Sequence, residues 1–144
     1  VGADEIVERI RPMIPRARTY FLVATLDYLQ KNGRISGAAK LVGSALQIKP
    51  ILQLVDGHID AFEKVRTHHA ALARIRELAR VECPHTPEAC LCVMHADVQL
   101  EANQLRNDLC AELGLAEIPL YSVGPAITTH AGPGTLAIGF FAAD

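Results

Sequence analysis

Residues 124–134 combine hydrogen-bonding side chains with a backbone rich in glycine and proline. The segment reads Gly-Pro-Ala-Ile-Thr-Thr-His-Ala-Gly-Pro-Gly, so Thr129 and His130 stand just before its last turn residues. Glycines such as Gly132 let a backbone approach a ligand closely, and prolines hold the shape of a loop. A histidine donates or accepts a hydrogen bond near neutral pH. The segment therefore favours a ligand-binding loop, although a turn between two strands with a structural histidine fits the same residues.

Residues 32–37, Asn-Gly-Arg-Ile-Ser-Gly, form a second candidate site. We expect one helix to end at Gly33 and another to begin at Ser36, with Ser36 as its N-cap. Free N–H groups at a helix start, beside the guanidinium of Arg34, suit a carboxylate or a phosphate. An ordinary joint between two helices, with Arg34 in solvent, has the same local pattern. The apolar face of the second helix is predicted to consist of Ala38, Leu41, Val42 and Ala45.

A third group consists of metal-ligand residue types within thirteen positions: Cys83, His85, Cys90, Cys92 and His95. Zinc has to be considered, but the spacings are poor and no C-x-x-C motif occurs. We expect inert thiols, with Cys90 and Cys92 on one face of a buried strand. A disulfide between Cys83 and Cys90, or a metal-binding module, are the alternatives. We expect no resident metal and no other cofactor, and the sequence leaves the state of Cys110 open.

Basic side chains gather at the start of a predicted helix and along one of its faces. At 100° per residue, four of them fall within about one quadrant: Arg66, His69, Arg76 and Arg80. Charge is also divided along the chain, since residues 1–82 carry 13 basic and 9 acidic side chains and residues 83–144 carry 1 basic and 7 acidic ones. Such a dipole favours oriented docking on a charged partner, and solvated faces are the alternative interpretation.

Composition excludes several classes of protein. Half of the 144 residues are hydrophobic, aromatic residues make up 5% and tryptophan is absent. Nucleic-acid binding by base stacking needs exposed rings and is not expected. No run approaches the roughly 20 apolar residues of a membrane span. Because the first residues lack the features of a signal peptide and a methionine, we expect a cytoplasmic protein and a chain that is a piece of something longer.

The hydropathy pattern predicts one mixed β-sheet of about six strands with helices packed on it, an α+β (two-layer α/β) domain that spans residues 1–144. Helices are predicted at 4–13, 25–32, from 36 onward, at 67–80 and at 98–113. Strands are predicted at 19–24, 48–55, 58–64, 90–95, 118–123 and 135–142, the last one central and buried on both faces. Asp56-Gly57 predicts a two-residue hairpin turn, the clearest local feature of the sequence.

Several segments, taken in order, resemble the DegV family of bacterial lipid-binding proteins. The strongest stretch runs from Tyr28 to Ser36 and continues from Val42 to Leu52. The later segments are Asp56-Gly57, residues 63–67, His95-Ala96-Asp97 and residues 127–134. Ordered motifs over nearly the whole chain are more specific than any one of them. Two positions depart from the family pattern: Asn32 stands where a second glycine is common, and Gly37 where a basic residue is usual.

The resemblance implies the C-terminal domain of a two-domain fold about twice as long, whose N-terminal domain is absent from this chain. Family members bind one long-chain fatty acid between the domains, and some present its carboxylate to a separate fatty-acid kinase subunit. By its motifs, the resemblance places His130 and Arg34 near the head group and Arg66 on a kinase-facing surface. We add the neighbouring residues Thr129, Ser36 and Gly132 to the expected ligand contacts. The expected protein is a non-catalytic carrier, and the chain alone is expected to bind lipid weakly or not at all.

An enzymatic alternative remains. The substrate subunit of dihydroxyacetone kinases resembles the same fold class and holds its ketone covalently on a histidine, a role open to His130. Against catalysis, neither a G-x-S-x-G motif nor a P-loop appears in the sequence, and no serine or cysteine nucleophile is clearly paired with His130.

Overall fold

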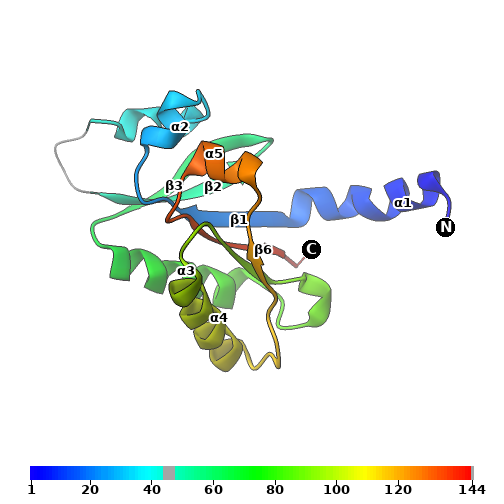
Figure 1. Cartoon of the computed structure of the whole chain (residues 1–144). Coiled ribbons are helices and arrows are strands. Elements are labelled where there is room, and N and C mark those ends of the chain that lie inside the picture. Colours follow the sequence, from blue (N-terminus) through cyan, green and yellow to red (C-terminus); the bar gives the residue numbers. More distant parts are fainter. Residues whose placement is uncertain (44–47, 144) are drawn as a thin grey trace.

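The computed structural model describes residues 1–43 and 48–143, and one mixed β-sheet forms its centre (Figure 1). Within that part of the chain, six strands pair in the order β3-β2-β1-β6-β4-β5. They are β1 (Ala17–Leu22), β2 (Lys49–Val55), β3 (His58–Val65), β4 (Cys92–His95), β5 (Leu120–Ser122) and β6 (Leu136–Phe141). Only β4 and β5 pair in parallel among these strands. The predicted mixed sheet of about six strands with helices packed on it is confirmed.

Two fifteen-residue helices, α3 (His68–Glu82) and α4 (Gln99–Leu113), cover one face of the sheet, called the closed face below (Figure 1). The hydroxyl of Thr67 accepts a hydrogen bond from the backbone N–H of Ala70 at 3.1 Å and caps α3, as predicted. Gly114, at φ 65°, ends α4 in the left-handed conformation. Large aliphatic side chains such as Ile75 and Leu109 are fully buried between these helices and the sheet.

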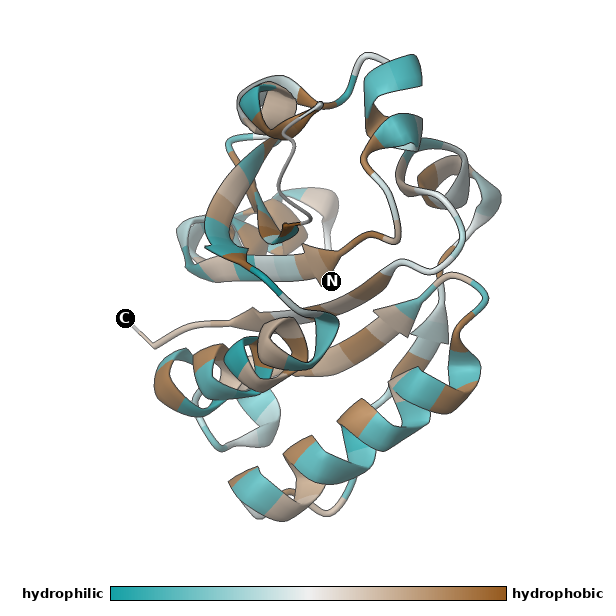
Figure 2. Cartoon of the chain, turned by 90° about the vertical axis from the view of Figure 1, so that its left-hand side faces the viewer, coloured by the Kyte–Doolittle hydropathy of each residue, from teal (hydrophilic) through white to brown (hydrophobic). Residues whose placement is uncertain are grey.

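Three short helical segments cover the opposite face, called the open face below. They are α2 (Asp27–Lys31), the 3-10 helix η2 (Ser36–Leu41) and α5 (Pro125–Ala131). A second, smaller core lies beneath them, and it includes Phe21, Leu29 and Ala137. Figure 2 shows the sheet between the two sets of helices, seen along its edge.

The strand β6 lies in the interior of the sheet, where it pairs with β1 and β4. Leu136 and Ile138 are fully buried on the closed face, and Ala137 between them is buried on the open face. Side chains alternate across a strand, so one segment contributes to both cores. The predicted central strand buried on both faces is confirmed.

The hairpin β2–β3 also forms as predicted. Asp56 and Gly57 both have positive φ, 49° and 75°, as the type I′ turn requires. The register shifts between Ile51 and Leu52, which places a β-bulge early in the hairpin.

The segment 124–134 is not the loop that we predicted, because residues 125–131 form the helix α5. Pro125 stands at the first helical position, where its fixed φ and its missing N–H are both tolerated. Gly132, at φ 87°, follows the last turn. The glycines and prolines at the two ends of this segment mark the boundaries of a helix.

Ser36 is not the N-cap that we predicted. Its φ of 33° is positive, and it is the first residue of η2, whereas an N-cap has an extended backbone. Ile35 occupies the cap position and makes no side-chain cap hydrogen bond. The predicted contribution of Ala45 to the apolar face of this helix lies outside the described residues.

At the N-terminus, α1 (Ala3–Ile10) extends away from the sheet and continues into the 3-10 helix η1 (Arg11–Arg16) (Figure 1). The α-helix ends earlier than the predicted Met13, because Pro12 and Pro15 cannot donate helical hydrogen bonds. No residue of α1 or η1 is buried. In the described part of the chain, no helix combines the length and the apolar character that a membrane crossing requires.

Candidate functional site

A pocket of about 610 Å³ lies between the open face of the sheet and the short helices above it. Its apolar lining comes from strand and helix residues alike, among them Phe21, Leu29, Ile59, Met94, Ile127 and Ala137. The sequence forms this pocket because α2, η2 and α5 are too short to cover the face, and because Ala137 projects little from β6. The result is an apolar cavity within the range of small-ligand sites.

Three of the predicted site residues meet at this pocket: Arg34, Ser36 and His130 all line it. Arg34 and Ser36 come from the connection between α2 and η2, and His130 comes from the last turn of α5. The fold therefore joins two segments that lie almost a hundred positions apart in the sequence. No aspartate or glutamate stands among the described residues that line the pocket, so Arg34 gives it a positive character.

His130 is only partly accessible, and its Nδ1 is buried with no hydrogen-bond partner in the described structure. Burying a polar nitrogen without a partner costs free energy, so such groups are uncommon outside functional sites. The ring of His130 thus lines the pocket with one nitrogen left unpaired in the described structure, which agrees with the predicted ligand-site histidine more than with a fully satisfied structural one.

Thr129 is positioned differently from His130. Its side chain is exposed, and its hydroxyl donates a hydrogen bond to the carbonyl of Pro125 at 2.8 Å, one turn earlier in α5. It is not among the residues that line the pocket. Its carbonyl accepts a hydrogen bond from the side-chain amide of Asn32, at 3.0 Å, and Asn32 also donates to the carbonyl of Tyr28. The asparagine that departs from the family pattern thus joins α2 to α5.

Gly132 also lies outside the pocket lining. A Cβ atom at this position would lie 2.4 Å from the ring of Tyr28, and the φ of 87° is itself unfavourable for other residues. Gly132 therefore allows α2 to pack against the end of α5. This glycine therefore serves the packing of two helices, whereas the sequence suggested close approach to a ligand.

Gly37 has an equally specific structural reason. A Cβ atom there would lie 1.5 Å from a side-chain oxygen of Asp60 on β3, so the carboxylate occupies the space that a side chain would need. Glycine at this position, where the family pattern has a basic residue, allows η2 to approach β3 closely.

The sequence did not identify His58, which also lines the pocket. It is the first residue of β3 and is exposed. The hairpin turn at Asp56-Gly57 was recognised, but only the fold shows that this hairpin end lies at the same pocket as Arg34 and His130. Thr19 and Thr135 contribute further polar groups to the lining.

One member of the predicted basic stripe is engaged within the fold, whereas Arg66, His69 and Arg80 are exposed. Arg76 makes ion pairs with Asp108, at 3.5 Å, and with Glu112, so it joins α3 to α4. Arg66 is exposed and lies between β3 and the N-cap of α3. Arg66 is therefore open to a partner, whereas Arg76 is used within the fold.

The cysteine group does not form a metal site in the described part of the chain, where no three His, Cys, Asp or Glu residues are arranged to hold an ion. All four cysteines are free, so the alternative disulfide is absent. Cys90 is exposed at φ 51° after the 3-10 turn η3 (Pro87–Ala89), before β4 begins, and so does not share a strand face with Cys92. Pro87 starts that turn and delays the strand. Burial raises the pKa of the Cys83 thiol to about 11 and also raises the pKa of the Cys92 thiol.

Comparison with known proteins identifies the fold and the family. The family model described as "Uncharacterised protein, DegV family" matches residues 2–143 of the chain. A DegV domain-containing protein of Streptomyces coelicolor is 40% identical over 136 residues, which cover 94% of this chain and 48% of that protein. The crystal structure of a fatty acid binding DegV family protein from Streptococcus agalactiae superposes with a TM-score of 0.83 at 32% identity, over 100% of this chain and 51% of that one. The Streptococcus pneumoniae Fatty Acid Kinase (Fak) B3 protein loaded with linoleic acid shares the fold, with a TM-score of 0.80 at 21% identity, over 99% of this chain and 50% of that one. The chain thus spans about half the length of the relatives that it matches, and it belongs to the DegV family.

Proposed function

We propose that this chain binds a long-chain fatty acid, with the acyl chain in the open-face pocket and the carboxylate near Arg34 and His130. The observation that carries the proposal is the composition of one cavity. The cavity has a volume of about 610 Å³ and a mainly apolar lining. Its described lining residues also include one arginine and two histidines but no carboxylate. An amphipathic anion fits this lining better than a sugar, a nucleotide or a triose does.

The driving force for binding is the burial of the acyl chain. Each methylene group removed from water contributes about 0.8 kcal/mol, so a chain of ordinary length supplies most of the affinity. The polar groups then fix which end of the ligand is where. The guanidinium of Arg34 offers parallel N–H donors that match a carboxylate, and the imidazole of His130 adds a further hydrogen bond.

The remaining ligand contacts follow from this arrangement. Ser36 lines the same pocket and offers a hydroxyl. Thr129 and Gly132 lie outside the pocket lining, so we propose an indirect role for them, in which they hold the end of α5 that positions His130. No covalent step is required of any of these residues, because the protein only desolvates the tail and holds the head. The chain acts in this proposal as a binding subunit without a catalytic residue.

The finer part of the proposal concerns the destination of the carboxylate. We propose that a separate cytoplasmic kinase docks near Arg66 and phosphorylates the bound acid, and that a second domain of the longer protein completes the head-group site. The exposure of Arg66 supports this step, as does the likeness of residues 64–67 to the kinase-facing motif of the family.

Binding is tested on the longer protein that includes the proposed second domain, because the chain alone is expected to bind lipid weakly, by displacement of a fluorescent fatty acid and by mass spectrometry of extracted lipid. Arg34→Gln should weaken binding roughly tenfold or more, since a hydrogen bond to a charged group is lost. Arg106→Gln on the outside of α4 removes the same charge and should leave binding unchanged. If no fatty acid binds, or if both variants bind as the parent does, the proposal fails.

The kinase step has a separate readout. Arg66→Gln should retain fatty-acid binding and lose phosphorylation of the bound acid when a fatty-acid kinase is supplied. Loss of binding in this variant, or unchanged phosphorylation, would exclude Arg66 as the docking residue.

A further inference from the structure

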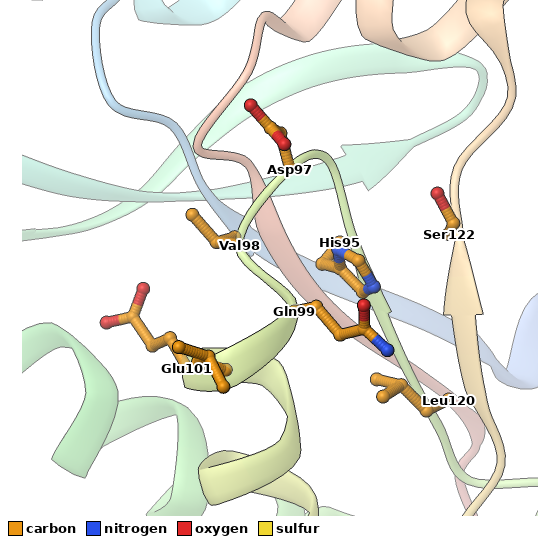
Figure 3. Close-up of a pocket in the computed structure, with 8 residues that line it drawn as sticks. His95, Asp97, Val98, Gln99, Glu101, Leu120 and Ser122 are labelled. Atoms are coloured by element: carbon orange, nitrogen blue, oxygen red, sulfur yellow. The ribbon is translucent and has the colours of Figure 1, made fainter.

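A second pocket, of about 820 Å³, is separate from the open-face pocket, here also called the acyl pocket, and is lined by residues of β4, β5 and the start of α4 (Figure 3). It opens where the parallel strands β4 and β5 end and where α4 begins. Its lining includes His95, Gln99 and Ser122, and it shares no residue with the lining of the acyl pocket. The carboxyl ends of parallel strands next to a helix start are a common location for ligands.

His95 is the observation that distinguishes this pocket from an ordinary surface hollow. Its side chain is among the buried polar groups, with the residue only 7% exposed, yet its Nδ1 has no hydrogen-bond partner in the described chain. Its neighbours Val93 and Met94 on β4 belong to the two cores, so His95 follows Val93 onto the closed face. Figure 3 shows its imidazole and the carboxamide of Gln99 pointing toward the strand that carries Ser122.

The first turn of α4 supplies further donors. Val98 is at the N-cap position and makes no side-chain cap hydrogen bond, whereas the equivalent position of α3 is capped by Thr67. The first N–H groups of a helix have no partner within the helix, so those of α4 are open to a ligand acceptor. Together with Ser122 and Gln99, they give the pocket several hydrogen-bond donors beside His95.

Charge decides which class of ligand suits these donors. The lining contains Asp97 and Glu101 but no lysine or arginine. Both carboxylates point away from His95 in Figure 3, and Glu101 pairs with His68. A phosphate would still be repelled by two nearby carboxylates, and a cation would be repelled by the positive end of α4. A neutral molecule that both donates and accepts hydrogen bonds meets neither penalty.

We propose that this pocket binds a small neutral polyol, a function beyond fatty-acid binding. The hydroxyl groups of the polyol accept hydrogen bonds from the backbone N–H groups of the first turn of α4 and from Gln99. They also form hydrogen bonds with the imidazole of His95 and the hydroxyl of Ser122. Leu120 is the half-buried apolar side chain beside which the carbon chain of the polyol lies, and Leu100 is exposed at the rim.

The test is an NMR titration of the chain with glycerol and with xylitol, observed at the backbone amides and at the imidazole nitrogens of His95. Both polyols should give saturable shifts at residues 95–101 and 122. The Gln99→Ala and Ser122→Ala variants should each bind roughly two- to tenfold more weakly, since each loses one hydrogen bond. Gln104→Ala, the same change on an exposed turn of α4 outside the pocket, should titrate as the parent does.

Inorganic phosphate and ethylammonium serve as charged probes of the same pocket. Saturable shifts with either ion but not with the polyols would overturn the assignment of ligand class. Shifts that never saturate, or that persist unchanged in both pocket variants, would overturn the site itself. Fatty-acid displacement measured on the same variants should not change, so a failure of this proposal is distinguishable from a failure of the acyl site.

Discussion

The two faces of the sheet are built from the same strands and yet differ in how they are covered. On the closed face, two fifteen-residue helices bury fully enclosed aliphatic side chains such as Leu109 and Ile138. On the open face, three short segments leave a pocket of about 610 Å³ over Phe21 and Ala137. The two long helices therefore enclose the larger core, whereas the three short segments leave the apolar open-face pocket uncovered.

Truncation of one leucine on each face gives the largest expected effect. Leu109 and Leu29 are both fully buried, but only Leu29 lines the open-face pocket. Leu109→Ala leaves an enclosed cavity and should lower the free energy of unfolding by about 2–5 kcal/mol, near the upper end of that range. Leu29→Ala enlarges an existing pocket and should fall near the lower end. Urea unfolding measures both, and an equal or larger loss for Leu29→Ala would contradict the comparison of the two faces.

Enlarging one alanine on each face should affect stability on the closed face and fatty-acid binding on the open face. Ala102 on α4 is fully enclosed, so Ala102→Leu overpacks the closed core and should cost about 1–3 kcal/mol of stability. Ala137→Leu extends into the pocket and should cost less, while it blocks the space of the acyl chain. Paired urea unfolding and fatty-acid displacement distinguish the two outcomes. Tight lipid binding by a folded Ala137→Leu variant would place the acyl chain elsewhere.

The sequence predicts the closed-face helices and the β2–β3 hairpin well because their signals are local. Thr67 and Gly114 mark helix ends by their own chemistry, and Asp56-Gly57 forms its turn wherever it stands between two strands. These features depend on neighbours within a few residues, so no knowledge of the fold is needed to find them.

The open face was harder to predict because its features arise from contacts distant in sequence. The positive φ of Ser36 accompanies the close contact of Gly37 with Asp60, which no local rule supplies. Gly132 and Tyr28 meet only after α5 packs on α2. The motif resemblance still located His130 and Arg34, whereas His58 was missed because its approach to them depends on the hairpin position in the sheet.

A smaller effect is expected at the helix caps, which differ between α3 and α5. The closed-face helix α3 has a side-chain cap, and the open-face helix α5 has none. Thr67→Ala should therefore lower the unfolding free energy by about 1 kcal/mol, while Thr67→Ser keeps the hydroxyl and should restore most of it. Fatty-acid binding should stay the same in both. A loss of lipid affinity in the Thr67→Ala variant would show that the two faces are coupled.

The smallest perturbation is chemical labelling of the cysteines, which needs no mutation. The four thiols differ in burial, so their labelling rates report the accessibility of different parts of the fold. Labelling followed by peptide mass spectrometry should modify exposed Cys90 first, because the thiolate is the reactive form and this thiol is accessible.

Burial raises the pKa of Cys83 to about 11, so its thiolate is scarce at neutral pH, and its labelling rate should rise as the pH approaches that value. Because the folded pKa of Cys83 lies above the ordinary value of 9.0, its contribution to stability is complete below pH 9 and declines toward pH 11. If Cys90 is labelled only after a reductant or a chelator is added, the finding that this thiol is free would be contradicted. Fast labelling of Cys83 at neutral pH would mean that the closed face opens more readily than its packing implies.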